Sequence, residues 1–224
     1  NLLEVCSKYK INEFIFSSTC AVYGNVKGIV TENMQKKPVS IYGKTKLKCE
    51  EEIKLYSKKY DFNFAILRYF NVGGSDLKNR IGCINKNNQL LKNLSVAVAN
   101  KSFKIDIFGK NYNTKDGTCI RDYIHLNDIS YIHLKILEIL KKKKKSYTLN
   151  CGYGYGFSVL DVIKNYEKIF KVRFKITIKS KRKGDIEIIY SSAKNLNKII
   201  KLKNKNRMTD IIKTSVLWEK NLNK

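Results

Sequence analysis

The sequence is poor in the residues that interrupt folded structure or bind metals. One proline and 12 glycines in 224 residues leave little room for disordered linkers, and 43% apolar content can form a substantial core. Two histidines are too few for a metal site without identified partners, and six cysteines without a Cys-x-x-Cys pair favour reduced thiols. No apolar run reaches the length of a membrane span. We therefore expect a compact cytoplasmic protein with no metal and no membrane partner.

Negative charge is also scarce, because 19 acidic residues stand against 45 basic ones and leave a net charge of +26. Such an excess is typical of proteins that bind nucleic acid or anionic membranes. Only six of the basic residues are arginines, however, and arginine forks usually contact bases and phosphates. The lysines are scattered, and the run at 141–145 follows an apolar helical stretch whose dipole favours cations at that end. The sequence thus predicts a lysine-biased surface and no nucleic-acid partner.

The most informative pattern is Tyr-x-x-x-Lys at Tyr42 and Lys46. The four-residue spacing places a phenol and an ammonium on one face of a helix. A phenol beside a fixed positive charge gives up its proton more readily, which makes a usable general base. Taken alone, the pattern would also fit a surface pair on a lysine-rich helix, so its meaning depends on the flanking segments.

Two strand-like segments flank this helix. One apolar run leads into the hydroxyls of Ser17, Ser18 and Thr19, and a second ends at Asn71. With the helical stretch at 42–60 between them, they predict a right-handed strand, helix, strand unit in a buried parallel sheet. Because ligands bind beyond the carboxyl ends of such strands, Thr19, Asn71 and the tyrosine should face one crevice.

Three motifs in this order resemble the extended short-chain dehydrogenase/reductase superfamily: Ser-Ser-Thr at 17–19, Tyr-x-x-x-Lys at 42–46 and Arg-Tyr-Phe-Asn at 68–71. Within it, the run at 107–125 looks like the signature of the UDP-glucose 4-epimerases. The similarity extends from Asn1 to Trp218, so it covers essentially the whole chain.

The resemblance implies an α/β fold, with a partial Rossmann-type parallel sheet and a smaller α/β substrate domain. Residues 1–72 and 119–150 would form the second half of the NAD-binding domain, with 122–125 returning to its sheet. Residues 73–118 and 151–224 would form the UDP-sugar-binding domain. No Gly-x-x-Gly-x-x-Gly or Gly-x-Gly-x-x-Gly loop follows a strand near the amino end, and residue 1 is not methionine. We expect that the first half, about a hundred residues, is missing and that this piece does not hold NAD tightly by itself.

The resemblance also implies the residues of a 4-epimerisation site. Tyr42 would be the general base, supported by Lys46, and Thr19 would bond the sugar 4-hydroxyl and relay its proton. NAD would contact residues near the ends of two strands and on the helix, namely Ser17, Tyr42, Lys46, Tyr69 and Phe70. UDP-glucose or UDP-galactose would contact Thr19, Asn71, Gln89, Phe108, Arg121, Arg182, Asp185 and Ile189. The resemblance also allows two copies of the chain to pair as a homodimer.

Part of this substrate site agrees with simple chemistry. Two phosphates call for planar cationic forks, and a ribose diol calls for a carboxylate that accepts from both hydroxyls. Arg121 and Arg182 offer the forks, and Asp185 offers the carboxylate. Taken singly, these residues would be ordinary surface charges.

The sequence departs from the family pattern at several positions. Thr19 stands where many relatives have serine, and Lys92, near Gln89, replaces a usual proline, which leaves the Gln89 contact open. Ile189 stands where some relatives have a tyrosine that crowds the sugar, so a hypothesis is that N-acetylated sugars are admitted. The alternatives are a truncated inactive remnant, a lysine-rich binding module, or another nucleotide-sugar epimerase or dehydratase. Cys20-Ala21 stands where 4,6-dehydratases place Asp-Glu, which argues against dehydration.

A different glycine pattern, Gly152-x-Gly154-x-Gly156, lies between a predicted strand at 147–150 and a predicted helix at 159–170. Glycines in such a place can bind phosphate. The spacing lacks the third glycine for helix packing and the acidic residue about 20 residues on. We therefore predict an ordinary turn before a helix that Ser158 caps, with Asp161 completing a capping box.

Overall fold

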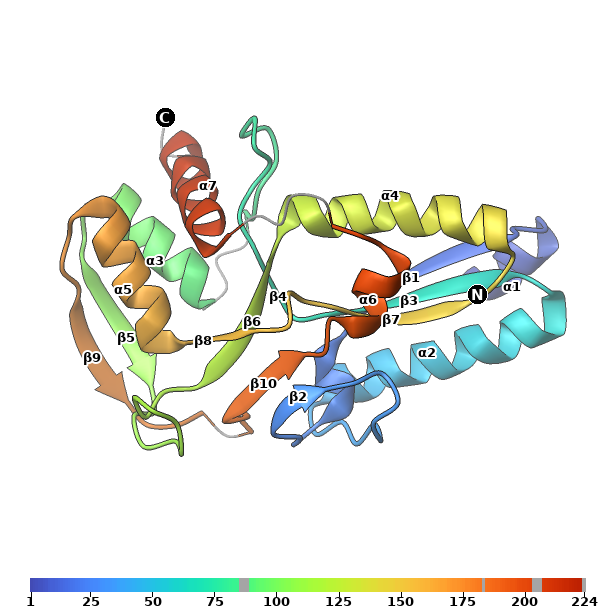
Figure 1. Cartoon of the computed structure of the whole chain (residues 1–224), viewed down its shortest axis with the longest axis horizontal. Helices are drawn as coiled ribbons and strands as arrows, with labels where there is room; N and C mark the ends of the chain where they lie inside the picture. Colours follow the sequence, from blue (N-terminus) through green and yellow to red (C-terminus); the bar gives the residue numbers. More distant parts are fainter. Residues whose placement is uncertain (85–88, 183, 203–206, 223–224) are drawn as a thin grey trace.

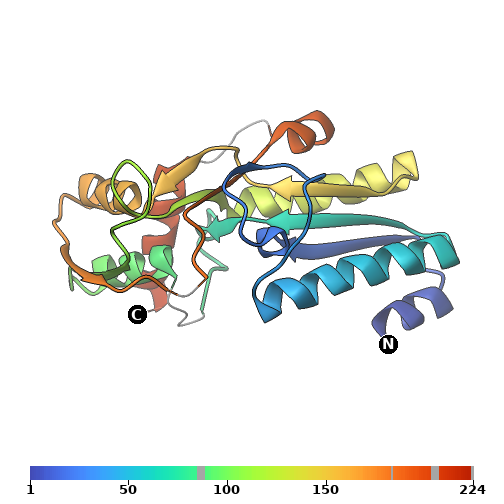
Figure 2. The ribbon, with the colours of Figure 1, turned by 90° about the horizontal axis from the view of Figure 1, so that it is seen from below.

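The computed structural model describes residues 1–84, 89–182, 184–202 and 207–222. Its first sheet contains three parallel strands in the order β1 (Glu13–Thr19), β3 (Asn63–Tyr69) and β7 (Tyr147–Cys151). Helix α2 (Ile41–Tyr60) covers one face and α4 (Leu126–Lys143) covers the other (Figures 1 and 2). The predicted strand, helix, strand unit is confirmed.

The register of this sheet brings the strand ends level. Thr19 pairs with Tyr69, and Tyr69 pairs with Cys151. Because the strands are parallel, their carboxyl ends lie at one edge, where the next residues along the chain turn toward the other half of the molecule (Figure 1). The hydroxyls of β1 and the ring of Tyr69 are therefore presented together.

A second sheet has the order β2 (Gly28–Val30), β10 (Ile188–Ser191), β6 (Ile120–His125) and β4 (Asn71–Gly73), and β8 (Gly156–Ser158) also pairs with β6. Strand β4 follows β3 after Phe70 and pairs with β6. The expectation that 122–125 returns to the first sheet is thus wrong, because β6 finds its partners in β4, β8 and β10. The division of the chain into domains stays a prediction.

The other half of the molecule is mainly helical. Helices α3 (Leu90–Ala99), α5 (Val159–Phe170) and α7 (Met208–Leu222) pack together beside the parallel pair β5 (Lys104–Phe108) and β9 (Lys175–Lys179) (Figure 1). The short elements are α1 (Leu2–Lys8), η1 (Cys20–Tyr23) and α6 (Lys194–Ile199). The predicted capping box is confirmed, since Ser158 and Asp161 exchange hydrogen bonds of 2.9 and 3.1 Å.

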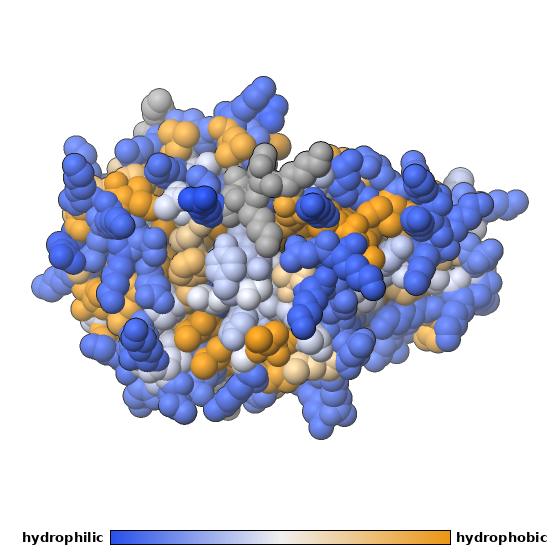
Figure 3. Space-filling model, viewed as in Figure 1, coloured by the Kyte–Doolittle hydropathy of each residue, from blue (hydrophilic) through white to orange (hydrophobic). Residues whose placement is uncertain are grey.

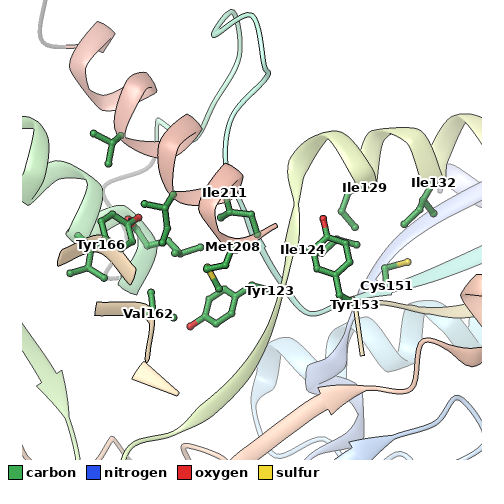
Figure 4. Close-up of a cluster of buried hydrophobic side chains, with 14 of the residues drawn as sticks. Tyr123, Ile124, Ile129, Ile132, Cys151, Tyr153, Val162, Tyr166, Met208 and Ile211 are labelled. Carbon is green, nitrogen blue, oxygen red and sulfur yellow. The ribbon is translucent and has the colours of Figure 1, made fainter. Parts of the chain in front are cut away.

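One large core runs through both halves, and β6 lies in the middle of it. Figure 4 shows Tyr123 toward Met208 and Ile124 on the opposite side, toward Ile129 of α4. Successive residues of a strand point to opposite faces, so β6 serves both halves at once. The second hydrophobic cluster, around Tyr23 and Val30, includes residues of η1, β2 and β10.

The surface is dominated by hydrophilic side chains, as Figure 3 shows for one face. Among the described residues, no helix combines the length and apolar character that crossing a membrane requires. The same residues contain no group of three histidine, cysteine, aspartate or glutamate side chains that could hold a metal ion.

Candidate active site

Thr19 is the last residue of β1, and Tyr42 lies in the first turn of α2. Thr19 Oγ1 accepts a hydrogen bond from the Ala21 amide at 3.1 Å, and Ser40 Oγ caps α2 by accepting from the Gly43 amide at 3.0 Å. A Cβ at Gly43 would lie 2.6 Å from the Ala21 carbonyl oxygen, so glycine allows the helix to start against η1. This close approach places Tyr42 on the same cavity as Thr19.

Lys46 lies one turn further along α2, on the side of Tyr42. Its Nζ is 5.9 Å from the centroid of the Tyr42 ring, so the shared helix face predicted from the spacing is confirmed. The ammonium donates to the Ser17 carbonyl oxygen at 3.0 Å and lies 4.7 Å over the Phe16 ring. One of its three N–H groups is used in this way, and the others are available to a ligand. Tyr42 is 57% exposed, so a ligand can reach it.

A cavity of about 470 Å³ lies between the carboxyl ends of the first sheet and the helical half. Ten predicted site residues line it: Thr19, Tyr42, Tyr69, Phe70, Asn71, Gln89, Phe108, Arg121, Arg182 and Asp185. Ser17 and Lys46 do not line it but are bonded to each other next to Tyr42. Ile189 does not line it either, because it is 3% exposed and belongs to the buried cluster that contains Phe70. The cavity therefore gives Ile189 no direct contact with a ligand.

The two arginines reach the cavity from different elements. Arg121, on β6, donates through Nη1 to the Ile120 carbonyl oxygen at 2.9 Å, which fixes its guanidinium. Arg182 follows β9 and stacks on Phe108, with its guanidinium carbon 3.9 Å from the ring centroid. Asp185 lines the same cavity and is exposed. Two cations, a flat ring and a carboxylate thus converge from segments that are far apart in the sequence.

Gln89 lines the cavity directly before α3, and its neighbour Lys92 has a structural partner. Lys92 Nζ donates to Glu219 of α7 at 2.6 Å and to the Cys83 carbonyl oxygen at 2.9 Å. Trp218 Nε1 donates to the same carbonyl at 3.0 Å. The lysine that replaces the usual proline therefore ties α3 to α7 and leaves Gln89 facing the cavity.

A buried ion pair that the sequence analysis missed lies behind the predicted site residues. Glu50, two turns after Tyr42 on α2, and Arg68 on β3 are 0% and 1% exposed, and their side chains form two hydrogen bonds of 2.7 and 3.0 Å. Ser18 Oγ donates to Glu50 at 2.6 Å. Because Ser18 precedes Thr19, this cluster ties the end of β1 to α2. The four-residue spacing of Tyr42, Lys46 and Glu50 was the signal that could have found it.

The ion pair is part of a larger buried network. Arg68 Nη1 donates to the Tyr23 hydroxyl at 2.8 Å, and Tyr23 donates to Asn150 at 2.6 Å. Asn150 in turn donates through its backbone amide to Glu32 at 2.9 Å. Desolvation raises the pKa of Tyr23 to about 12, so this phenol stays protonated and donates. Every polar group named here has a hydrogen-bond partner, which is the condition under which buried charge is tolerated.

Comparison with protein-family models finds one match over residues 1–152, with the NAD dependent epimerase/dehydratase family. The chain belongs to this family. It is 33% identical to the UDP-glucose 4-epimerase of Azospirillum brasilense over 224 residues, which is 99% of this chain and 64% of the relative. The chain thus spans less than two thirds of that relative's length.

Solved structures of several epimerases resemble this family member closely. The UDP-glucose-4-epimerase of Stenotrophomonas maltophila, solved with NAD and formylated UDP-arabinopyranose, superimposes with a TM-score of 0.94 at 31% identity, covering 99% of this chain and 67% of that one. The UDP-Glc/GlcNAc 4-epimerase of Campylobacter jejuni has a TM-score of 0.79 at 38% identity, covering 98% and 68%. The predicted resemblance and the α/β fold are confirmed.

The glycine turn of this family member holds an internal carboxylate. The backbone amides of Tyr153 and Gly154 donate to Asp122 at 3.0 and 3.1 Å, and Ser191 donates to it through its amide and hydroxyl. A Cβ at Gly152 would lie 2.4 Å from Asp122 Oδ2. The amides that could have held a phosphate are used within the fold, which agrees with the prediction of an ordinary turn.

Cys20 occupies the position directly after Thr19 where 4,6-dehydratases carry an acid. Desolvation raises the pKa of the Cys20 thiol to about 11, with the nearby Arg121 acting in the opposite direction. A thiol that keeps its proton at neutral pH does not replace a carboxyl group as an acid and base pair. The chemistry of this position therefore argues against dehydration, as the sequence does.

Proposed function

We propose that the protein interconverts UDP-glucose and UDP-galactose by NAD-dependent 4-epimerisation when the glycine-loop half of the cofactor domain is present. The observation that carries the proposal is one cavity that joins Thr19 and Tyr42 to the two arginines, Arg121 and Arg182. The lining includes a phenol and a hydroxyl that suit a base and its partner, and also groups that suit a nucleoside diphosphate. A carboxylate, Asp185, is present for the ribose diol.

The residues next to Tyr42 fit the nicotinamide end of NAD. Lys46 has unused N–H donors for a ribose diol, and Ser17 and Tyr69 offer hydroxyls beside it. The outer edge of β1 pairs with no other strand among the described residues, so a further parallel strand with a glycine loop can add there. When bound, NAD would accept a hydride from the sugar and return it. We infer that Ser17, Tyr42, Lys46, Tyr69 and Phe70 hold this end of the cofactor.

The chain's own residues account for the proton and the orientation of the sugar. Tyr42, supported by Lys46, takes the proton of the sugar 4-hydroxyl, and Thr19 bonds that oxygen. Asn71, Arg121 and Arg182 keep the diphosphate in place while the 4-keto sugar turns over in the cavity. The proton then returns from Tyr42 to the opposite epimer, so configuration changes without net oxidation.

The test compares this chain with a fusion that carries the glycine-loop segment of the Azospirillum brasilense relative ahead of residue 1. Conversion of UDP-galactose to UDP-glucose and retention of NAD are measured on both. We expect NAD retention and turnover in the fusion, and weak or no retention in the chain alone. A folded fusion that binds UDP and NAD without turnover would support an inactive remnant instead.

Two further parts of the proposal concern the sugar and the assembly. Competing assays with UDP-glucose and UDP-N-acetylglucosamine test whether the cavity admits N-acetylated sugars. Pairing of two copies as a homodimer is tested by sedimentation of the fusion.

A further inference from the structure

Tyr69, at the end of β3, is joined to side chains on both sides. Its hydroxyl lies 2.9 Å from Ser17 Oγ and 2.8 Å from His133 Nε2. The other ring nitrogen of His133, Nδ1, lies 2.9 Å from the carbonyl oxygen of Ile129, one turn earlier on α4. The two rings meet edge to face at a centroid distance of 5.9 Å. A chain of hydrogen bonds therefore runs from α4 to the strand ends next to the cavity.

The donor and acceptor roles along this series of hydrogen bonds are set by the Ile129 carbonyl at its end on α4. The Ile129 carbonyl can only accept, so His133 Nδ1 must carry the hydrogen. In the neutral ring, Nε2 then has only a lone pair, and the Tyr69 hydroxyl must donate to it. The opposite tautomer would turn the lone pair of Nδ1 toward the carbonyl oxygen, leaving two acceptors facing each other.

The hydrogen bond to His133 also determines whether the Tyr69 hydroxyl can donate or accept on the side of the cavity. Burial raises the pKa of Tyr69 to about 12, with the Ser17 hydrogen bond acting in the opposite direction, so the phenol stays protonated at neutral pH. Its single hydrogen is committed to His133, and its oxygen can only accept from the other side. In this structure the donor there is the Ser17 hydroxyl, and Tyr69 itself lines the cavity.

We propose that His133 is a positioning residue that fixes Tyr69 as a hydrogen-bond acceptor for a neutral N–H donor, such as a carboxamide, bound beside Ser17. This inference rests on the proposed function, because the nicotinamide of NAD carries a carboxamide. A ligand with a carbonyl but no N–H at that position should be bound less well, since two acceptors would face each other.

The first test measures the ring tautomer of His133 by NMR in the 224-residue chain. His125 and His133 are the only histidines, and they are expected to differ. His125 Nδ1 accepts from the Asn127 amide at 3.0 Å, so its hydrogen belongs on Nε2. Long-range ¹H–¹⁵N spectra of the histidine-labelled chain at pH 8 should therefore show one ring of each tautomer. Hydrogen on Nε2 of His133, alone or together with Nδ1, would overturn the proposal.

The second test measures ligand preference in the fusion described above. The probes are NAD and 3-acetylpyridine adenine dinucleotide, in which a methyl ketone replaces the carboxamide. One lost hydrogen bond corresponds to a preference for NAD of about tenfold in dissociation constant. The preference should disappear in Tyr69→Phe and His133→Leu, and His133→Gln should restore part of it, because an amide oxygen can accept from Tyr69.

The matched control is Glu138→Gln, an exposed position on the same helix that should leave the preference unchanged. Folding of each variant is checked by circular dichroism. NAD binding with the same tenfold preference in His133→Leu would overturn this inference alone. Absence of NAD binding in the unaltered fusion would overturn the proposed function and the ligand assignment together, while the tautomer measurement would still decide the role of His133.

Discussion

Tyr42 and Glu50 lie two turns apart on helix α2, and their surroundings could hardly differ more. Tyr42 is 57% exposed and faces a cavity, whereas Glu50 is fully buried and bonded to Arg68 and Ser18. A reactive group must remain accessible to its substrate, and a supporting group must have its hydrogen bonds satisfied inside the protein. The difference indicates that the exposed site is held in place by the buried cluster behind it.

Removing one side of the buried cluster should have the largest effect on stability. Arg68→Met leaves the Glu50 carboxylate without its charged partner, and breaking such a pair typically lowers the free energy of unfolding by about 3–5 kcal/mol. Urea denaturation of the chain measures this change.

The control for Arg68→Met lies on the same helix. Lys48 and Glu52 form an exposed pair at 3.1 Å, and Glu52→Gln should leave the unfolding midpoint unchanged. Equal midpoints for the two variants would show that the Glu50 and Arg68 pair is not the support that the structure indicates.

A substitution beside the exposed Tyr42 should instead lower turnover and leave stability nearly unchanged. Lys46→Met in the fusion removes the charge beside Tyr42 and should lower turnover about 100-fold, equivalent to about 2.7 kcal/mol, with little change in the unfolding midpoint. Steady-state kinetics and urea denaturation on the same samples check both parts. A large loss of stability with turnover preserved would reverse the division between the two regions.

The close packing around Asp122 provides a second test on the buried side. In Gly152→Ala the new Cβ would lie 2.4 Å from Asp122 Oδ2 and 2.5 Å from Ser191 Oγ, so unfolding should become easier by about 1–3 kcal/mol. Gly28→Ala is the control, because its Cβ would meet nothing within 4 Å and only the backbone strain would remain. An unchanged free energy of unfolding in Gly152→Ala would contradict the close contact with Asp122.

The smallest predicted effect is a dependence of stability on pH. Burial lowers the pKa of His125, while Asp128 and Asp210 act in the opposite direction. Below the ordinary value of about 6.5, the unfolded chain binds a proton that the folded chain resists, so stability falls by up to about 1.4 kcal/mol per pH unit. Protonation would also remove the lone pair that accepts from the Asn127 amide.

The measurement for His125 is the urea midpoint between pH 7.5 and 5.5. His125→Gln keeps an acceptor at this helix start without a titrating ring, and should flatten the dependence. Glu138→Gln, on the surface of the same helix, should not. A slope that persists in His125→Gln would assign the effect to other groups.

Local patterns predicted the parts of the site that are built from local structure. The spacing of Tyr42 and Lys46, the hydroxyls at the end of β1 and the cap at Ser158 all follow from helix or strand geometry, and the structure shows each of them. They could be predicted because each depends on neighbours within one or two turns of the chain.

What the sequence did not predict depends on residues that are distant along the chain. Strands β5 and β9 pair although a long segment separates them, and β6 joins β10 and β4 in a sheet of its own. The partners of Glu50 and the Tyr69 partner of His133 lie on other elements. No local periodicity specifies such partners, because the choice is made by packing in three dimensions.

The most direct test of the account is UDP-galactose turnover by the fusion and by its Tyr42→Phe variant, with UDP binding measured in parallel. Loss of the phenol removes the proposed base and should lower turnover at least about 1,000-fold while leaving UDP binding nearly intact. Turnover at the unaltered rate in Tyr42→Phe would contradict the assignment of Tyr42 as the base of this site.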